Sequence, residues 1–117
     1  MLLGKENSIN QKLVQEISEV FPIQFREYFV FMADAQIRPD VNPKIFFINL
    51  MDVGGDETDL LGMLQVRFPE SRKIAIHTFQ EEIMVRTTLK KGFDGYLSIF
   101  DLNEDLLPLL SSFNLYN

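Results

Sequence analysis

Residues 45–49 read Ile45-Phe46-Phe47-Ile48-Asn49, and this stretch is the strongest indication of the fold. A strand exposed to water on one face alternates apolar with polar side chains, whereas a strand covered on both faces reads as a continuous apolar run. The stretch therefore predicts a buried strand of a parallel sheet. Similar runs, rich in β-branched and aromatic residues, occur at residues 29–32, 74–76 and 95–99, and residues 1–3 would supply a fifth strand.

Segments with helical periodicity separate these runs. Four helices are predicted: from an N-cap at Ser8 to residue 21, from a cap at Thr58 to residue 68, over residues 80–91, and from near Asn103 onward. Strands and helices that alternate over short connections predict an α/β fold of the doubly wound, flavodoxin-like type, with a five-stranded parallel sheet in the order 2-1-3-4-5. On such a fold the functional crevice lies at the carboxyl ends of the strands.

Prolines interrupt two of the connecting segments. Residues 33–43 have room for about two helical turns, but Pro39 and Pro43 leave little uninterrupted sequence, so the second helix of the fold is expected to be short or missing. Pro108 is tolerated only near the first turn of a helix, because proline has no backbone N–H to donate. The last helix is therefore expected to start late, to bend or to be short.

Length and composition restrict the class of protein. The 117 residues fit a single domain, 1–117, and the absence of cysteine excludes disulfides and thiolate metal sites. The first residues carry too short an apolar run for a signal peptide, and no stretch approaches the length of a membrane span, so a cytoplasmic protein without membrane contact is expected. Seventeen acidic against eleven basic residues give a net charge of −6, which disfavours direct nucleic-acid binding.

Two motifs at opposite ends of the chain carry a resemblance to a known family. They are Leu2-Leu3-Gly4-Lys5-Glu6-Asn7-Ser8-Ile9-Asn10-Gln11-Lys12 and Lys90-Lys91-Gly92-Phe93-Asp94-Gly95-Tyr96-Leu97. The first resembles the start of receiver domains of hybrid sensor kinases, in which two acids and Asn-x-x-Asn-Gln-Lys follow an apolar strand. The second resembles the family's Lys-Ala-Gly-Ala-Asp-Gly-Tyr-Leu. Together with residues 49–54 and the strand ending at residues 77–78, the resemblance to response-regulator receiver domains covers essentially the whole chain.

The resemblance implies five site positions, which here hold Lys5, Glu6, Asn49, Thr78 and Ile99. In the family, two acids after the first strand and an aspartate ending the third hold Mg²⁺, and that aspartate accepts the phosphoryl group. A hydroxyl after the fourth strand and a lysine after the fifth then hold the phosphoryl oxygens. Only the acid at Glu6 and the hydroxyl of Thr78 remain. The implied protein is a degenerate pseudo-receiver of two-component, phosphorelay type.

Simple chemistry supports the loss of phosphoryl transfer. The amide of Asn49 is a poor nucleophile and cannot become an acyl phosphate. An ammonium at Lys5 would repel a divalent cation by on the order of 8 kcal/mol at about 4 Å and an effective dielectric of about 20. Lys5 could instead pair with Glu6 or bond the Asn49 carbonyl. We therefore expect a pocket of Lys5, Glu6, Asn49 and Thr78 with no metal, no cofactor and no enzyme activity.

A surface for protein partners is expected beside this pocket. In active receivers, the hydroxyl and the aromatic ring at the positions of Thr78 and Tyr96 move together when phosphate binds. The alternative is that Thr78 merely ends a strand and Tyr96 packs on a helix. Phe79, Ile83, Tyr96 and Phe100 are predicted to form a contact face over the helix at 80–91, the strand at 95–99 and the last helix. Its partner would be a sensor kinase, an output protein or a second copy, forming a homodimer.

Other residues offer alternative functions. Asp52 or Asp56 could serve as a substitute phosphoacceptor, although loop carboxylates more often cap or solvate. A small ligand could bind as in flavodoxin-like proteins, but the loop at residues 4–8 lacks a glycine pattern for phosphate. His77 could act as a ligand or catalyst at the rim, and the glycine pair at residues 54–55 could cradle an anion. A locally hydrogen-bonded histidine and a turn are the simpler interpretations.

Overall fold

The computed structural model describes residues 1–37 and 42–115 and contains a five-stranded parallel sheet in the predicted order, β2-β1-β3-β4-β5. The strands are β1 (Leu2–Gly4), β2 (Phe25–Glu27), β3 (Ile45–Asn49), β4 (Arg72–His77) and β5 (Gly95–Ser98). The helices are α1 (Ser8–Ser18), α2 (Tyr28–Ile37), α3 (Leu50–Val53), the 3₁₀ turn η1 (Gly54–Asp56), α4 (Glu57–Arg67), α5 (Glu82–Leu89) and α6 (Leu102–Ser112). The flavodoxin-like prediction is confirmed.

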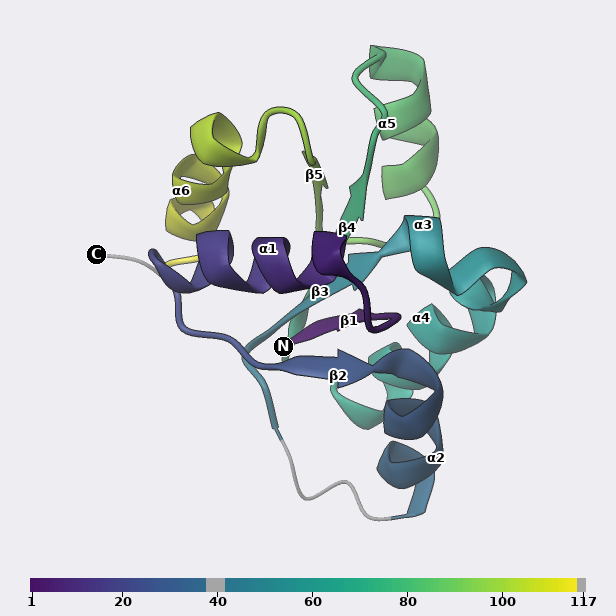
Figure 1. Cartoon of the computed structure of the whole chain (residues 1–117). Helices are drawn as coiled ribbons and strands as arrows, with labels where there is room; N and C mark the ends of the chain where they lie inside the picture. Colours follow the sequence, from purple (N-terminus) through teal and green to yellow (C-terminus); the bar gives the residue numbers. More distant parts are fainter. Residues whose placement is uncertain (38–41, 116–117) are drawn as a thin grey trace.

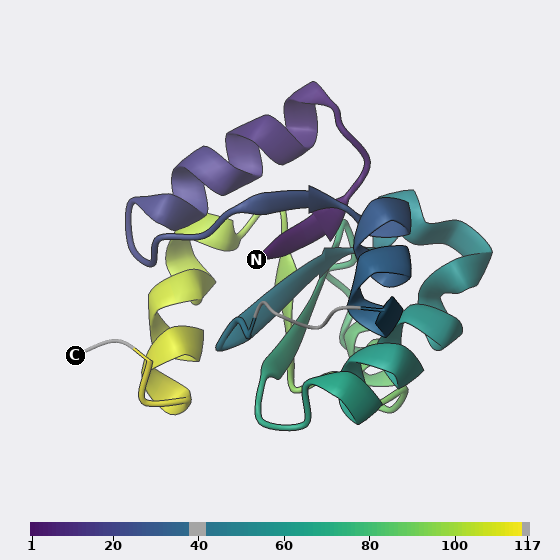
Figure 2. The ribbon, with the colours of Figure 1, turned by 90° about the horizontal axis from the view of Figure 1, so that it is seen from below.

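Helices cover both faces of the sheet (Figures 1 and 2). One apolar cluster joins α1 and α6 to the sheet, and it includes Phe47 of β3 and Leu110 of α6. The other cluster lies on the opposite face against α2, α3 and α4, and it includes Phe46 and Phe68. All five residues of β3 are buried, as the continuous apolar run at 45–49 requires.

The prediction of a strand at residues 29–32 is wrong. The second strand is β2, and the apolar run belongs to α2, where Tyr28 and Phe31 are buried while Phe29 and Val30 are each 52% exposed. Residues three apart share one face of a helix, and a short apolar run does not by itself distinguish a helix from a strand. The second helix is therefore neither missing nor confined to residues 33–43; residues 38–41 of that predicted segment lie outside the described residues.

Several helix termini also differ from the prediction, and the helix predicted over residues 80–91 spans Glu82–Leu89. Asn7, not Ser8, caps α1, because its Oδ1 accepts from the backbone N–H of Asn10 at 2.8 Å, and the helix ends at Ser18. Asp56, not Thr58, stands at the N-cap position of α4. The last helix begins at Leu102 and continues past Pro108 to Ser112, so it is neither late nor short.

Candidate functional site

The candidate site lies where β1, β3 and β4 end. Because these strands are parallel, their carboxyl ends meet at one edge of the sheet, and the turns that follow them lie together. Gly4 ends β1, Asn49 ends β3 and His77 ends β4. In Figure 1 the start of α1 and the short helix α3 lie on the side toward which the β1 arrow points.

Asn10, a buried asparagine that was not among the predicted site residues, connects the turns after β1 and β3. Asn10 is 1% exposed, and its Nδ2 donates to the Lys5 carbonyl at 2.5 Å and to Asp52 Oδ2 at 2.7 Å. Its Oδ1 accepts from Asn49 Nδ2 at 2.7 Å. Asn49, also 1% exposed, caps α3 by accepting from the backbone N–H of Met51 at 3.1 Å. The spacing of Asn7 and Asn10 within the first motif was the available signal.

Asp52, in the helix α3, also binds the loop after β1 directly. Its Oδ2 accepts from the Lys5 backbone N–H at 3.1 Å, and its Oδ1 accepts from Asn7 Nδ2 at 3.4 Å. A Cβ on Gly4 would lie 2.7 Å from Asp52 Oδ2 and 2.6 Å from Asn10 Nδ2, so this approach requires glycine. We call these groups, from Lys5, Asn7, Asn10, Asn49 and Asp52, the Asn10 network.

The two positions that the resemblance assigns to acids, Lys5 and Glu6, do not place their side chains in the Asn10 network. The side chains of Lys5 and Glu6 are exposed, and Lys5 enters the Asn10 network through its backbone N–H and carbonyl. The Asn49 amide oxygen accepts from Met51 rather than from the Lys5 ammonium. Ile99 is half-buried and packs against the apolar cluster beneath α1 and α6, where it presents no charge.

Residues after β4 form a second set of contacts, which includes Tyr96. The backbone N–H of Thr78 donates to His77 Nδ1 at 2.7 Å, so this nitrogen is the acceptor of the neutral ring, and the Thr78 hydroxyl lies 3.1 Å from it. The His77 ring stacks on Phe79, with 4.0 Å between ring centroids. Tyr96 donates its hydroxyl to the Phe79 carbonyl at 2.7 Å, and burial raises the pKa of Tyr96 to about 12.

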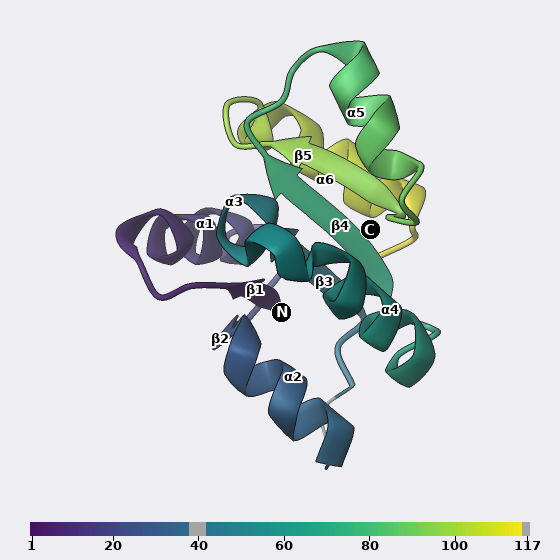
Figure 3. The same ribbon diagram turned by 90° about the vertical axis from the view of Figure 1, so that its right-hand side faces the viewer.

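The exposed apolar residues of the predicted contact face belong to neighbouring elements. Ile83 on α5 is 73% exposed and Phe100 after β5 is 65% exposed, whereas Tyr96 and Phe79 are half-buried. Figure 3 shows α5 beside β5, with α6 behind that strand. We call these four residues the α5–β5–α6 face.

The other candidate residues have structural explanations. Asp56 accepts from the hydroxyl of Tyr28 at 3.1 Å, which ties η1 to α2. Gly54 has a φ of 55°, a left-handed conformation that favours glycine, so the glycine pair serves the turn between α3 and α4. No helix in the described part of the chain is long and apolar enough to cross a membrane.

The side chains at the strand ends do not fit a divalent cation. Mg²⁺ and similar ions need several oxygen ligands, but the groups that converge on the Asp52 carboxylate are N–H donors. Within residues 1–37 and 42–115, no group of three or more His, Cys, Asp or Glu side chains could hold a metal ion.

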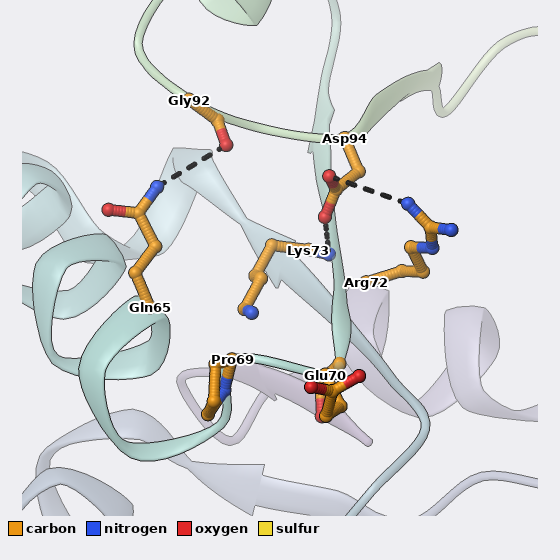
Figure 4. Close-up of a pocket in the computed structure, with 8 residues that line it drawn as sticks. Gln65, Pro69, Glu70, Arg72, Lys73, Gly92 and Asp94 are labelled. Atoms are coloured by element: carbon orange, nitrogen blue, oxygen red, sulfur yellow. Dashed lines mark hydrogen bonds and ion pairs between the residues drawn. The ribbon is translucent and has the colours of Figure 1, made fainter.

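A cavity of about 350 Å³ lies at the opposite edge of the sheet, near the start of β4 (Figure 4). Lys73 is buried there, and burial lowers its pKa. Its Nζ donates to the Phe68 carbonyl at 2.5 Å, at the end of α4, while its backbone N–H donates to Asp94 Oδ2 at 2.7 Å. A cation at the carboxyl end of a helix satisfies free carbonyls, so Lys73 has a structural role.

Comparisons with known proteins support the fold. No protein-family model matches the sequence, and no curated protein matches it. Among solved structures, the crystal structure of the Mn²⁺-bound form of response regulator Rcp1 is similar, with a TM-score of 0.64 and 18% sequence identity. The match covers 96% of this chain and 91% of that chain. The chain therefore has a receiver-like fold.

Proposed function

We propose that this chain is a receiver-like signalling module that acts by binding other proteins and is not phosphorylated at Asn49. The observation that carries the proposal is the state of Asn49 at the end of β3. The side chain of Asn49 is a buried amide. Its Nδ2 donates to Asn10 and its Oδ1 accepts from Met51, so both polar atoms are hydrogen-bonded. An amide is neither the nucleophile nor the anion that acyl phosphate formation needs.

The surroundings of Asn49 support the same conclusion. Ile99 offers no charge to a phosphoryl oxygen, and the Thr78 hydroxyl lies beside His77 Nδ1. Asp52, the alternative acceptor, has both carboxylate oxygens engaged by N–H donors of the first loop. These hydrogen bonds stabilise the carboxylate and lower its reactivity toward a phosphodonor.

Incubation with acetyl phosphate followed by intact-mass measurement tests the chemistry. We expect no phosphorylated species for the wild type or for Asn49→Asp, because Lys5 and Ile99 remain. Recovery should require at least Lys5→Asp and Ile99→Lys in addition. Robust labelling of the single variant would contradict the proposal, and peptide mapping of a labelled wild type to Asp52 would establish the substitute acceptor instead.

The binding role is assigned to the α5–β5–α6 face. Exposed aromatic and aliphatic side chains are frequent anchors of interfaces, and Phe100 and Ile83 are the most exposed members of this face. The Tyr96–Phe79 hydrogen bond holds the loop between β4 and α5 against β5. The expected partner is a sensor kinase, an output protein or a second copy related by two-fold symmetry.

Light scattering and pull-down from the native host, each with wild type and variants, test this face. Tyr96→Ala and Phe100→Ala should lower the measured mass or the partner recovery. Val66→Ala is the matched control, because Val66 is a 78% exposed apolar residue on α4. Equal mass and equal recovery for all four proteins would place the functional surface elsewhere.

A further inference from the structure

We propose that Asp52, acting through Asn10, holds the strand ends together without a divalent cation. The similar response-regulator structure is a Mn²⁺-bound form, whereas the groups that converge here are the donors of the Asn10 network. The hydrogen bonds of this network involve neither a partner nor a phosphodonor.

The orientation of both buried amides follows from the backbone groups at the two ends of the network. The Lys5 carbonyl can only accept, so Asn10 must present its Nδ2 there and its Oδ1 to Asn49. The Met51 N–H can only donate, so Asn49 must present its Oδ1 there and its Nδ2 to Asn10. Both backbone groups therefore require the same orientation of the two amides, in which Asn49 Nδ2 donates to Asn10 Oδ1.

The Asp52 carboxylate performs the cross-link that a cation would otherwise make. It comes from α3, after β3, and it accepts from three N–H groups of the loop after β1 and the start of α1. A cation joins two loops by coordinating oxygen atoms from both, whereas this carboxylate joins them by accepting hydrogen bonds from N–H groups. Hydrogen bonds to an ionised acceptor are among the stronger ones, and Asn10 is too buried for water to replace it.

An aspartate at position 49 would therefore conflict with the network. Its carboxylate would face Asn10 Oδ1, which accepts at 2.7 Å from the present amide. Asn10 cannot rotate in response, because its oxygen would then face the Lys5 carbonyl and Asp52 Oδ2. Asn49 is thus required by its neighbours, and its identity is coupled to that of Asp52.

Thermal melting of the full chain in EDTA, in Mg²⁺ and in Mn²⁺ tests the proposal. The wild type should melt at the same temperature in all three. Asp52→Asn and Asn49→Asp should each melt about 4 °C lower, the shift that roughly 1 kcal/mol produces in a domain of about 120 residues. Asp34→Asn and Asn42→Asp, exposed positions that undergo the same charge changes, should melt like the wild type.

The double variant Asn49→Asp/Asp52→Asn should lose less than the sum of the single losses, since the two carboxylates no longer oppose each other. Additive losses, a wild-type melting temperature raised by either ion, or Asn49→Asp melting like Asn42→Asp would each overturn the proposal.

A measurement on the wild type alone tests the proposal even if the variants fail to fold. In NMR spectra, the side-chain NH₂ groups of Asn10 and Asn49 should exchange slowly with solvent, because both are buried and hydrogen-bonded. Paramagnetic Mn²⁺ should leave both signals sharp. Fast exchange of these groups, or their selective broadening by Mn²⁺, would overturn the proposal. Neither experiment contains a partner or acetyl phosphate, so failure here is distinguishable from failure of the proposed function.

Discussion

Two features of its surroundings favour the neutral form of the His77 ring. Its Nδ1 accepts from the Thr78 backbone N–H, which a protonated nitrogen could not do. Burial lowers the pKa of His77, and the nearby charges of Glu57 and Lys91, which pair with each other at 2.8 Å, act in opposite directions on it. Stacking on Phe79 connects the ring to the loop that binds Tyr96.

Stability should accordingly fall as the pH drops below about 6.5, the ordinary histidine pKa. Since the folded pKa is lowered, the unfolded chain binds a proton first, so acid favours unfolding until the folded state is protonated too. His77→Asn keeps an acceptor near Nδ1 but does not titrate. Urea unfolding of both proteins between pH 7.5 and pH 5 should show a stability difference that shifts against the wild type as the pH falls. Parallel profiles would contradict this assignment.

The helix α6 forms although it contains Pro108, a residue that is unfavourable in a helix interior. Pro108 is the seventh of its eleven residues and cannot donate to the carbonyl of Glu104. Leu102, Leu106 and Leu110 are buried at four-residue spacing on one face. Burying each leucine contributes about 1.5–3 kcal/mol, which together exceeds the roughly 3 kcal/mol that an interior proline costs. Packing therefore determines the length of this helix.

Replacement of this proline should stabilise the protein. Pro108 is exposed, so Pro108→Ala restores a helical hydrogen bond without disturbing the core. The gain should be about 2 kcal/mol, because the cost of proline in a helix is partly offset by the restricted unfolded chain. Chemical denaturation measures it. Ser111→Ala, at an exposed position of the same helix, should change stability by less than about 0.5 kcal/mol. A loss of stability in Pro108→Ala would show that the proline fits a local bend.

At the scale of the whole molecule, the sheet separates two apolar clusters. Phe46 and Phe47 are adjacent in β3 and both 0% exposed, yet they belong to different clusters on opposite faces. Phe68 reaches Phe46 from the end of α4, with 5.2 Å between ring centroids. Sequence neighbours are thus separated in the core, while residues distant in sequence share it.

This separation predicts which core substitutions are coupled. Phe46→Leu and Phe47→Leu should each cost about 1–2 kcal/mol and should add to within about 0.5 kcal/mol. Phe46→Leu and Phe68→Leu should lose less than their sum by about 0.5 kcal/mol or more, because the first change already removes part of the ring contact. Double-mutant cycles in urea measure both. Strong coupling of the adjacent pair would indicate that the two faces repack together.

The fold class, the strand order and four of the five strands could be predicted from the amino-acid sequence. A strand covered on both faces consists of consecutive apolar residues, and that pattern is local, as in the stretch at 45–49. The amide at Asn49 and the apolar side chain at Ile99 were likewise readable, because the chemistry of a side chain depends on the residue type alone.

The second strand, the course of α6 and the Asn10 network depend on tertiary contacts that no local pattern contains. The edge strand β2 has three residues and is only half-buried, so its sequence carries little signal, and the apolar run beside it fits a helix or a strand equally well. The run of α6 past Pro108 depends on leucine packing against the sheet. Asn10 and Asp52 lie 42 positions apart, and their hydrogen bond forms because parallel strands bring their carboxyl ends to one edge.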